Sequence, residues 1–217
     1  MTPEKTCRVV IIGAGDLGVL LAHHLRAVPG LALAGFVDDT MEPGERADGR
    51  VLGGSADVRA LHEAGVCDAF LIGVGYRHFK ARQQLFEKFI DVLPAATLIH
   101  PSAHVDATAE VMAGAVVFPR SVIDVGAVLE VNVLVNTAAV VCHHSRVGAH
   151  SFVAPAACIA GFTQVGRRCF VGMNATIRDN AVITDDVVIG AGAVVTRSIE
   201  SAGTHAGVPA RLLREAS

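Results

Sequence analysis

The sequence contains no tryptophan and a single tyrosine, and aromatic residues make up only 5% of it although 52% of it is hydrophobic. Small and β-branched side chains must therefore fill the interior, which favours a repetitive and tightly stacked core. The high hydrophobic content and the low charged content also exclude a disordered chain.

An excess of charge and a long apolar run are missing as well. The 18 basic and 21 acidic residues leave a formal net charge of −3, which removes the electrostatic argument for binding nucleic acid or an anionic membrane. Outside glycine-rich repeats, no uncharged span of about 18 residues suits a bilayer, and the first residues lack the pattern of a signal peptide. We expect a cytoplasmic protein without membrane insertion.

The cysteines do not form a recognisable framework. There are five of them, an odd number, and none has the CxxC spacing. This argues against a set of disulfides and against a zinc site, so we expect no metal. Most of the cysteines are interpreted as small buried hydrophobic residues.

Strand patterns and helix patterns alternate in the first part of the chain. We predict strands at Arg8–Ile12, Leu31–Val37 and Ala69–Val74, helices at Asp16–Val28, Ser55–Ala64 and Arg77–Leu93, and a polar loop at Thr40–Arg50. This order indicates an α/β half-Rossmann domain (βαβαβ) over residues 1–95, in which helices cover both faces of a parallel sheet.

The second part has a different period. From Ile99 to Val195 every sixth residue is Val, Ile or Leu, at seventeen successive positions, and a small residue follows four places after nearly every one of them. A period of six cannot keep residues on one face of an α-helix with 3.6 residues per turn. Six-residue units instead predict the flat sides of a three-sided prism.

Three such sides make one coil of the chain, and successive coils stack about 4.8 Å apart, so the sixteen full hexads make about five coils. We therefore predict a parallel β-helix of hexapeptide repeats with a C-terminal tail over residues 96–217. This β-helix is left-handed in the proteins known to have it. Its flat faces are suited to pairing with copies of the same chain.

One stretch of the predicted column departs from the usual corner residues. His143 follows the inward-facing Val141 by two positions, so its side chain should point outward beside His144. Gly161 comes one coil later and should lie about 4.8 Å from His143. Its backbone N–H is open to approach and could donate to an oxyanion, although a corner that needs a positive φ explains this glycine equally well.

Several segments resemble the nucleotide-sugar acetyltransferases of the sialic-acid O-acetyltransferase type: IHPSA from Ile99, VNTAAVVCHHSRVG from Val135, VAPAACIAG from Val153, VGMNATI from Val171, IGAGAVVTR from Ile189 and AGVPARLL from Ala206. IIGAGDLG and GFVDD extend the resemblance to almost the whole chain. It implies a bacterial enzyme of glycan biosynthesis that uses acetyl-CoA to N-acetylate an amino sugar carried on UDP, dTDP or GDP. It also implies a homotrimer with active sites between subunits.

The resemblance places the general base at His143, which would take a proton from the amine as the amine attacks the thioester. The neighbouring residue in the family is usually Asp or Glu, which fixes the tautomer of the base, whereas this chain has His144. The resemblance places acetyl-CoA between two columns, against Phe152, Gly161, Met173 and Ala191. Phe152 stands where a second histidine is common.

The segment from Gly13 to Gly18 fits GxGxxG between a strand and a helix, with an acidic pair further on, and by itself it would predict NAD. No oxidoreductase domain follows it. By resemblance we expect a nucleotide-sugar site formed by Gly13, Gly15, Asp16, Leu17, Asp38, Asp39 and Gly75. Asp16 and Leu17 replace the Gly-His that is usual in the family, and Asp16 would repel a phosphate.

Three alternatives stay open. The same fold and His143 would also serve O-acetylation of a sialic acid-like sugar. A metal-binding hydratase of the carbonic anhydrase type would use His143, His144 and His150, although their spacing does not match that of its ligands. A non-catalytic scaffold is the third alternative, because the usual acid beside His143 is missing.

Overall fold

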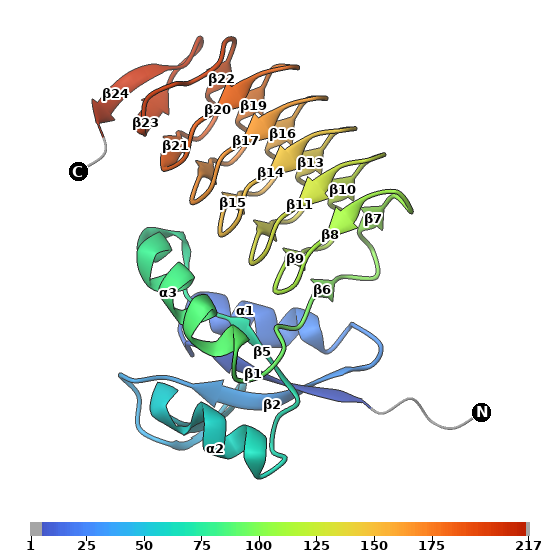
Figure 1. Ribbon diagram of the computed structural model, residues 1–217, viewed down its shortest axis with the longest axis vertical. Coiled ribbons are helices and arrows are strands. Elements are labelled where there is room, and N and C mark those ends of the chain that lie inside the picture. The colour runs from blue at the N-terminus through green and yellow to red at the C-terminus, as the bar shows by residue number, and fades with distance from the viewer. Residues whose placement is uncertain (1–5, 216–217) are drawn as a thin grey trace. The chain divides into compact units, whose positions relative to one another are not determined.

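A computed structural model describes residues 6–215 (Figure 1). The chain divides into two compact units, Met1–His100 and Pro101–Ser217, a few residues later than the predicted boundary after residue 95. Within the described residues, no helix is long and apolar enough to cross a membrane.

The first unit is an α/β unit built on one five-stranded sheet with the order β3-β4-β2-β1-β5. Figure 1 shows α1 and α3 on one face of this sheet and α2 on the other. Strands β1, β2, β4 and β5 are parallel. The elements are β1 (Cys7–Ile12), α1 (Asp16–Leu25), β2 (Leu31–Val37), β3 (Gly44–Arg46), β4 (Gly49–Gly53), η1 (Ser55–Asp57), α2 (Val58–Glu63), β5 (Ala69–Ile72), η2 (Tyr76–His78) and α3 (Phe79–Ile90).

The prediction of a loop at Thr40–Arg50 is wrong. The chain forms a hairpin there, in which β3 pairs antiparallel with β4 across a two-residue turn at Ala47–Asp48. The Asp48-Gly49 pair is a typical hairpin signal. The residues around it are mostly glycine, proline and charged residues, so they lack the apolar alternation that indicates strands. The sheet is consequently mixed: β3 is antiparallel to β4, and β4 adds a parallel strand to the three that the apolar runs predict.

The second unit is a column with three faces, and each face is a sheet in which the strands of successive coils pair in parallel, as the hexad period predicts. Sheet 1 contains β7 (His104–Val105), β10 (Val122–Ile123), β13 (Val140–Val141), β16 (Cys158–Ile159), β19 (Thr176–Ile177) and β22 (Val194–Val195). Sheet 2 contains β8 (Glu110–Val111), β11 (Val128–Leu129), β14 (Arg146–Val147), β17 (Gln164–Val165) and β20 (Val182–Ile183). Sheet 3 begins with β6 (Leu98–Ile99), just before the boundary at His100, and continues with β9 (Val116–Val117), β12 (Leu134–Val135), β15 (Phe152–Val153), β18 (Phe170–Val171), β21 (Val187–Ile189), β23 (Gly203–Ala206) and β24 (Arg211–Glu215).

The predicted ladder of aliphatic side chains forms the core of this left-handed β-helix. From Val117 to Val195 every sixth residue is at most 3% exposed, whereas Ile99, Val105 and Val111, in the first coil, are half-buried. Paired strands belong to successive coils, so Val141 lies between Ile123 and Ile159. At the far end β24 turns back antiparallel to β23.

The corners of the column impose a second period of six. Every sixth residue from Gly114 to Gly192 has a positive φ, between 54° and 75°, and most of these residues are not glycine. We call residues 125–126, 143–144, 161–162 and 179–180, which follow sheet 1, the histidine corner. Residues 137–138, 155–156, 173–174 and 191–192, which precede sheet 1, form the methionine corner. Side chains at one corner therefore lie above each other, one from each coil.

We expect Ile159→Ala to lower the free energy of unfolding by about 2–5 kcal/mol, because the fully buried side chain would leave a cavity between Val141 and Ile177. Val182→Ala is the control: it shortens a side chain that is 53% exposed on sheet 2 and should change stability by less than about 0.5 kcal/mol. Urea unfolding followed by circular dichroism measures both. Equal effects of the two substitutions would contradict a stacked aliphatic core.

Candidate active site

His143 and His144 lie at the histidine corner directly after β13, and both are exposed. Their Nδ1 atoms are 3.3 Å apart, within hydrogen-bonding distance, so one ring donates and the other accepts. Nε2 of His143 makes no hydrogen bond with a residue in the described range 6–215. It is therefore available to a reactant, and it lies beside Gly161.

Gly161 lies directly against the His143 ring. A Cβ atom on Gly161 would come within 2.6 Å of His143 Nε2 and 2.5 Å of Cε1, closer than atoms can approach. Its φ is not positive, so the alternative explanation, a corner that needs a left-handed conformation, does not apply to it. Contact with His143 is what excludes a side chain at this position.

The first residue of a corner pair turns its backbone N–H away from the ladder, and oxygen atoms of side chains accept it at several corners. Such acceptors lie 2.7–2.8 Å from the nitrogens of Val125 (Asp124), Thr137 (Asn136), Ala149 (Glu130) and Arg167 (Asp185). Among residues 6–215, no group accepts the N–H of Gly161. This amide is thus a free donor of the kind that binds carboxylate oxygen elsewhere on the column.

The other residues predicted to hold acetyl-CoA do not form one continuous surface in a single chain. Met173, which is 53% exposed, and Ala191 lie one above the other at the methionine corner. Sheet 1 separates that corner from Gly161 at the histidine corner. Phe152 is only 5% exposed and packs against Phe170, at 5.8 Å between ring centroids, so it offers little surface to a cofactor.

The predicted nucleotide site lies at the carboxyl ends of β1 and β5. β1 has β2 on one side and β5 on the other, so the order of the strands reverses there, and ligands of open α/β sheets bind at such a reversal. Gly15 and Gly75 end the loops after these two strands, and a Cβ on either would meet no atom within 4 Å. These two glycines face open space, where a ligand can approach the backbone.

Close packing beneath this edge explains the remaining glycines. A Cβ on Gly18 would collide with the carbonyl oxygen of Gly13, and one on Gly73 would come 2.5 Å from the same oxygen. Gly13 itself has a φ of +103°. The GxGxxG pattern is therefore partly a packing motif, and only Gly15 in it is open to a ligand. Asp16 is exposed in the first turn of α1, and Leu17 is half-buried.

Asp38 and Asp39 are bonded to the backbone of neighbouring loops. Asp38 accepts hydrogen bonds from Ala14 N (2.8 Å), Thr40 N (2.9 Å) and Thr40 Oγ1 (2.6 Å). Burial raises the pKa of this carboxyl group, but the bonds from Thr40 and Ala14 outweigh burial and hold the pKa below its ordinary value. Asp39 accepts from Ser55 N at 2.6 Å and is more exposed.

Sequence reasoning missed Arg82, which sets the shape of the loop before Gly75. This side chain is fully buried on α3 and donates to the carbonyl oxygens of Ile72 (2.9 Å) and Val74 (3.0 Å) at the end of β5. Burial lowers its pKa to about 10, so it stays charged at neutral pH. A charged residue in an amphipathic helix gives no sign in the sequence that it points inward.

Comparison with known proteins shows the family to which the chain belongs. The model of the bacterial transferase hexapeptide family (six repeats) matches residues 162–197. The acetyltransferase domain of PglB from Neisseria gonorrhoeae FA1090, solved with acetyl coenzyme A, is 30% identical with a TM-score of 0.88, over 96% of this chain and 100% of that domain. The chain belongs to the hexapeptide-repeat acetyltransferases.

A second structure agrees with this membership. A mutant of GDP-perosamine N-acetyltransferase from Caulobacter crescentus, in complex with CoA and GDP-perosamine, is 31% identical with a TM-score of 0.89, over 95% of this chain and 97% of that one. WeeI from Acinetobacter baumannii AYE shares the fold at 18% identity and a TM-score of 0.54. No curated protein matches the sequence.

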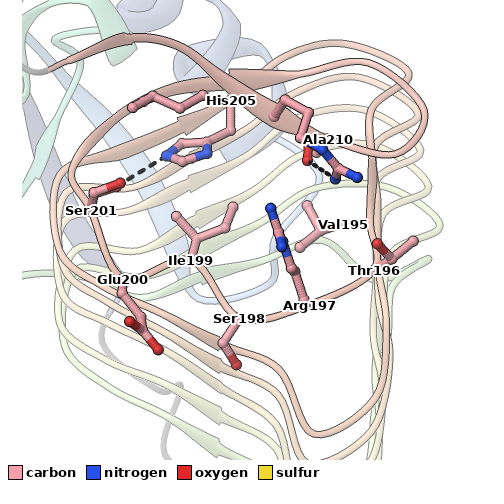
Figure 2. Close-up of a pocket in the computed structure, with 11 residues that line it drawn as sticks. Val195, Thr196, Arg197, Ser198, Ile199, Glu200, Ser201, His205 and Ala210 are labelled. Carbon is pink, nitrogen blue, oxygen red and sulfur yellow. Dashed lines mark hydrogen bonds between the residues drawn. The ribbon is translucent and has the colours of Figure 1, made fainter.

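Two other features of this hexapeptide-repeat acetyltransferase lie away from the histidine pair. A cavity of about 480 Å³ at the last turn of the column is lined by Val195–Ser201, His205 and Ala210–Leu212, none of which is a predicted site residue (Figure 2). His150 is buried at the third corner beside Asn132, at 3.0 Å. Within residues 6–215, no group of three or more His, Cys, Asp or Glu residues is placed to hold a metal ion.

We expect Asp38→Ala to destabilise the first unit by about 1–3 kcal/mol at pH 7, because the buried Ala14 N–H loses its acceptor. The pKa of Asp38 is lower in the folded protein than in the unfolded chain, where it is about 3.9. The ionised carboxylate therefore stabilises the fold at pH values above about 3.9. That contribution is lost as the pH falls through the pKa of Asp38 in the folded protein. The difference in free energy of unfolding between variant and parent should therefore narrow below about pH 4.

Urea unfolding at pH 7 and at pH 3.5 measures this gap. Glu63→Ala, at the exposed end of α2, is the matched control and should change stability by less than about 0.5 kcal/mol at either pH. A gap for Asp38→Ala that widens in acid would contradict the role given to its carboxylate.

Proposed function

We propose that this chain is an acetyl-CoA-dependent N-acetyltransferase of a nucleotide-linked amino sugar. Relatives at 30–31% identity over nearly the whole chain were solved with acetyl coenzyme A, or with CoA and GDP-perosamine. The observation that carries the proposal in this chain is that the free Nε2 of His143 lies against Gly161, whose N–H has no acceptor among residues 6–215. One can accept a proton and the other can stabilise an oxyanion at the same point.

The reaction follows from these two groups. The amine nitrogen attacks the thioester carbonyl carbon while His143 Nε2 takes a proton from that nitrogen. The N–H of Gly161 donates to the carbonyl oxygen as it becomes negative. When the tetrahedral intermediate collapses, the carbon–sulfur bond breaks and the proton passes from His143 to the sulfur of CoA. The products are the N-acetylated sugar and CoA.

Direct transfer is favoured over an acetyl-cysteine intermediate. Cys142 precedes His143, and a cysteine nucleophile needs its thiolate form. Burial is the main cause that raises the pKa of the half-buried Cys142 thiol above its ordinary value. Neutral Cys142 leaves the sugar amine as the nucleophile.

Acetyl-CoA fits the outer surface of the column best if two chains contribute to its site. Gly161 offers a donor at the histidine corner, and Met173 and Ala191 offer apolar exposed surface at the methionine corner. We propose that the methionine corner of a second chain faces the histidine corner of the first in a homotrimer. Phe152, buried in this chain, is the weakest of the proposed contacts.

For the nucleotide sugar we propose the edge of the first unit at Gly13, Gly15, Leu17 and Gly75. The open backbone at Gly15 and Gly75 lets a diphosphate approach, provided that it lies on the side of the loop away from the carboxylate of Asp16. Asp38 fixes the loop through Ala14, and Asp39 is the more exposed partner proposed to contact the base. The nucleotide is UDP, dTDP or GDP.

His143→Ala should lower kcat for acetyl transfer by about 10²–10⁴-fold, because it removes the group proposed to take the proton from the amine. Release of CoA from acetyl-CoA in the presence of a nucleotide amino sugar measures the rate. His104→Ala, which removes an exposed histidine from the same sheet, should leave the rate and the circular-dichroism spectrum unchanged. Turnover by His143→Ala close to that of the parent would refute the general base.

A panel of UDP-, dTDP- and GDP-linked amino sugars and NADH should show preferential thermal stabilisation by one of the sugars. A ligand at 100 times its Kd stabilises by about 2.7 kcal/mol. Gly15→Ser should abolish this shift but keep the melting temperature without ligand, because serine suits the N-cap and occupies the open space. A shift with NADH alone would instead support a dinucleotide site.

A further inference from the structure

Phe162 occupies a conformation that is unusual for a bulky residue. Its φ is +57° and its side chain is 51% exposed, whereas the residues one coil away on either side at the second corner position are His144 and Asn180. Every corner of the column requires a positive φ at this position, so the backbone conformation follows from the fold, but a bulky aromatic side chain is disfavoured there. Neither burial nor backbone preference accounts for a phenylalanine here.

The contacts of Phe162 are with the two histidines. Its ring stacks on that of His144, with 5.0 Å between centroids and 12° between planes, and meets the ring of His143 edge-on at 5.1 Å and 83°. Gly126 lies on the other side of His144, and a Cβ there would come within 3.1 Å of His144 Cδ2. His144 is therefore held between Gly126 and Phe162.

The orientation of His144 decides where the proton on His143 resides. For Nε2 of His143 to act as a base, its neutral ring must carry the proton on Nδ1 and needs an acceptor for it. His144 Nδ1, at 3.3 Å, is that acceptor. If the His144 ring turned over, a carbon would take the place of Nδ1, and the tautomer of His143 would no longer be fixed.

We propose that Phe162 is a positioning residue for the His143–His144 pair: its stacked ring stops His144 from turning and so keeps Nε2 of His143 free of its proton. This rests on the proposed function, in which His143 is the general base. A carboxylate at position 144 could accept with either oxygen and would need no such stack. An imidazole offers only one acceptor atom in the right place, Nδ1. Phe162 therefore compensates for the lack of a carboxylate at position 144 by keeping that atom in place.

The test is Phe162→Asn, which keeps a residue that tolerates the left-handed corner and removes the ring. We expect kcat to fall by about tenfold or more, KM for acetyl-CoA to change little, and the melting temperature to stay the same or rise. In ¹⁵N-histidine NMR spectra, His143 should change from the Nδ1–H tautomer to a mixture. Arg120→Asn, at another exposed corner with a positive φ, is the matched control and should change none of these.

A double substitution separates positioning from a mere packing effect. With His144→Asp in place, Phe162→Asn should change kcat by less than about twofold, because a carboxylate fixes His143 without the stack. An equal loss in both backgrounds, or a loss confined to KM for acetyl-CoA, would overturn the proposal. If His143→Ala retains activity, the proposed function fails. If His143→Ala is inactive but Phe162→Asn matches the parent, only this inference fails.

Discussion

The chemistry of the second unit depends on one constraint, a backbone ladder in which each coil of three hexads repeats the one before it. The aliphatic core holds each coil in register with the next, so outward side chains at equivalent positions of successive coils are forced into contact. This register places Gly161 against His143 and Phe162 against His144. It also aligns Arg168 with Asp186, which form an ion pair at 2.7 Å. A slip of one hexad would separate all of these pairs.

The first unit is organised by a different constraint, the close approach of backbone atoms around the Gly13 carbonyl oxygen. Gly18 and Gly73 have no room for a Cβ there, which brings α1 and the loop after β5 close to the end of β1. Asp38 and Arg82 then fix the two loops from either side through backbone groups. The open glycines Gly15 and Gly75 thus lie at an edge held by these contacts, which is where we propose that the nucleotide sugar binds.

In the proposed mechanism, Phe162 compensates for the absence of a carboxylate beside His143. A carboxylate beside the base would supply charge and two equivalent acceptor atoms, whereas His144 supplies one acceptor atom on a ring that can turn. Phe162 and Gly126 sandwich that ring. His144 and Phe162 lie one full coil apart along the chain, so their relation follows from the coil length and not from neighbourhood in the sequence.

The column, its register and the outward position of His143 follow from the sequence, because a strict period of six leaves a chain of this composition no other way to bury its aliphatic residues. The parallel core of the first unit was predictable too, since long apolar strands carry a strong signal. The hairpin β3–β4 was missed because its short strands have no apolar alternation. Only tertiary contacts determine that Arg82 points inward and that Phe152 is buried. The same holds for the His143 ring, which leaves no room for a side chain at Gly161, and for Phe162, which stacks on His144. Each of these depends on which atoms lie across a gap, and residue type and spacing do not specify that.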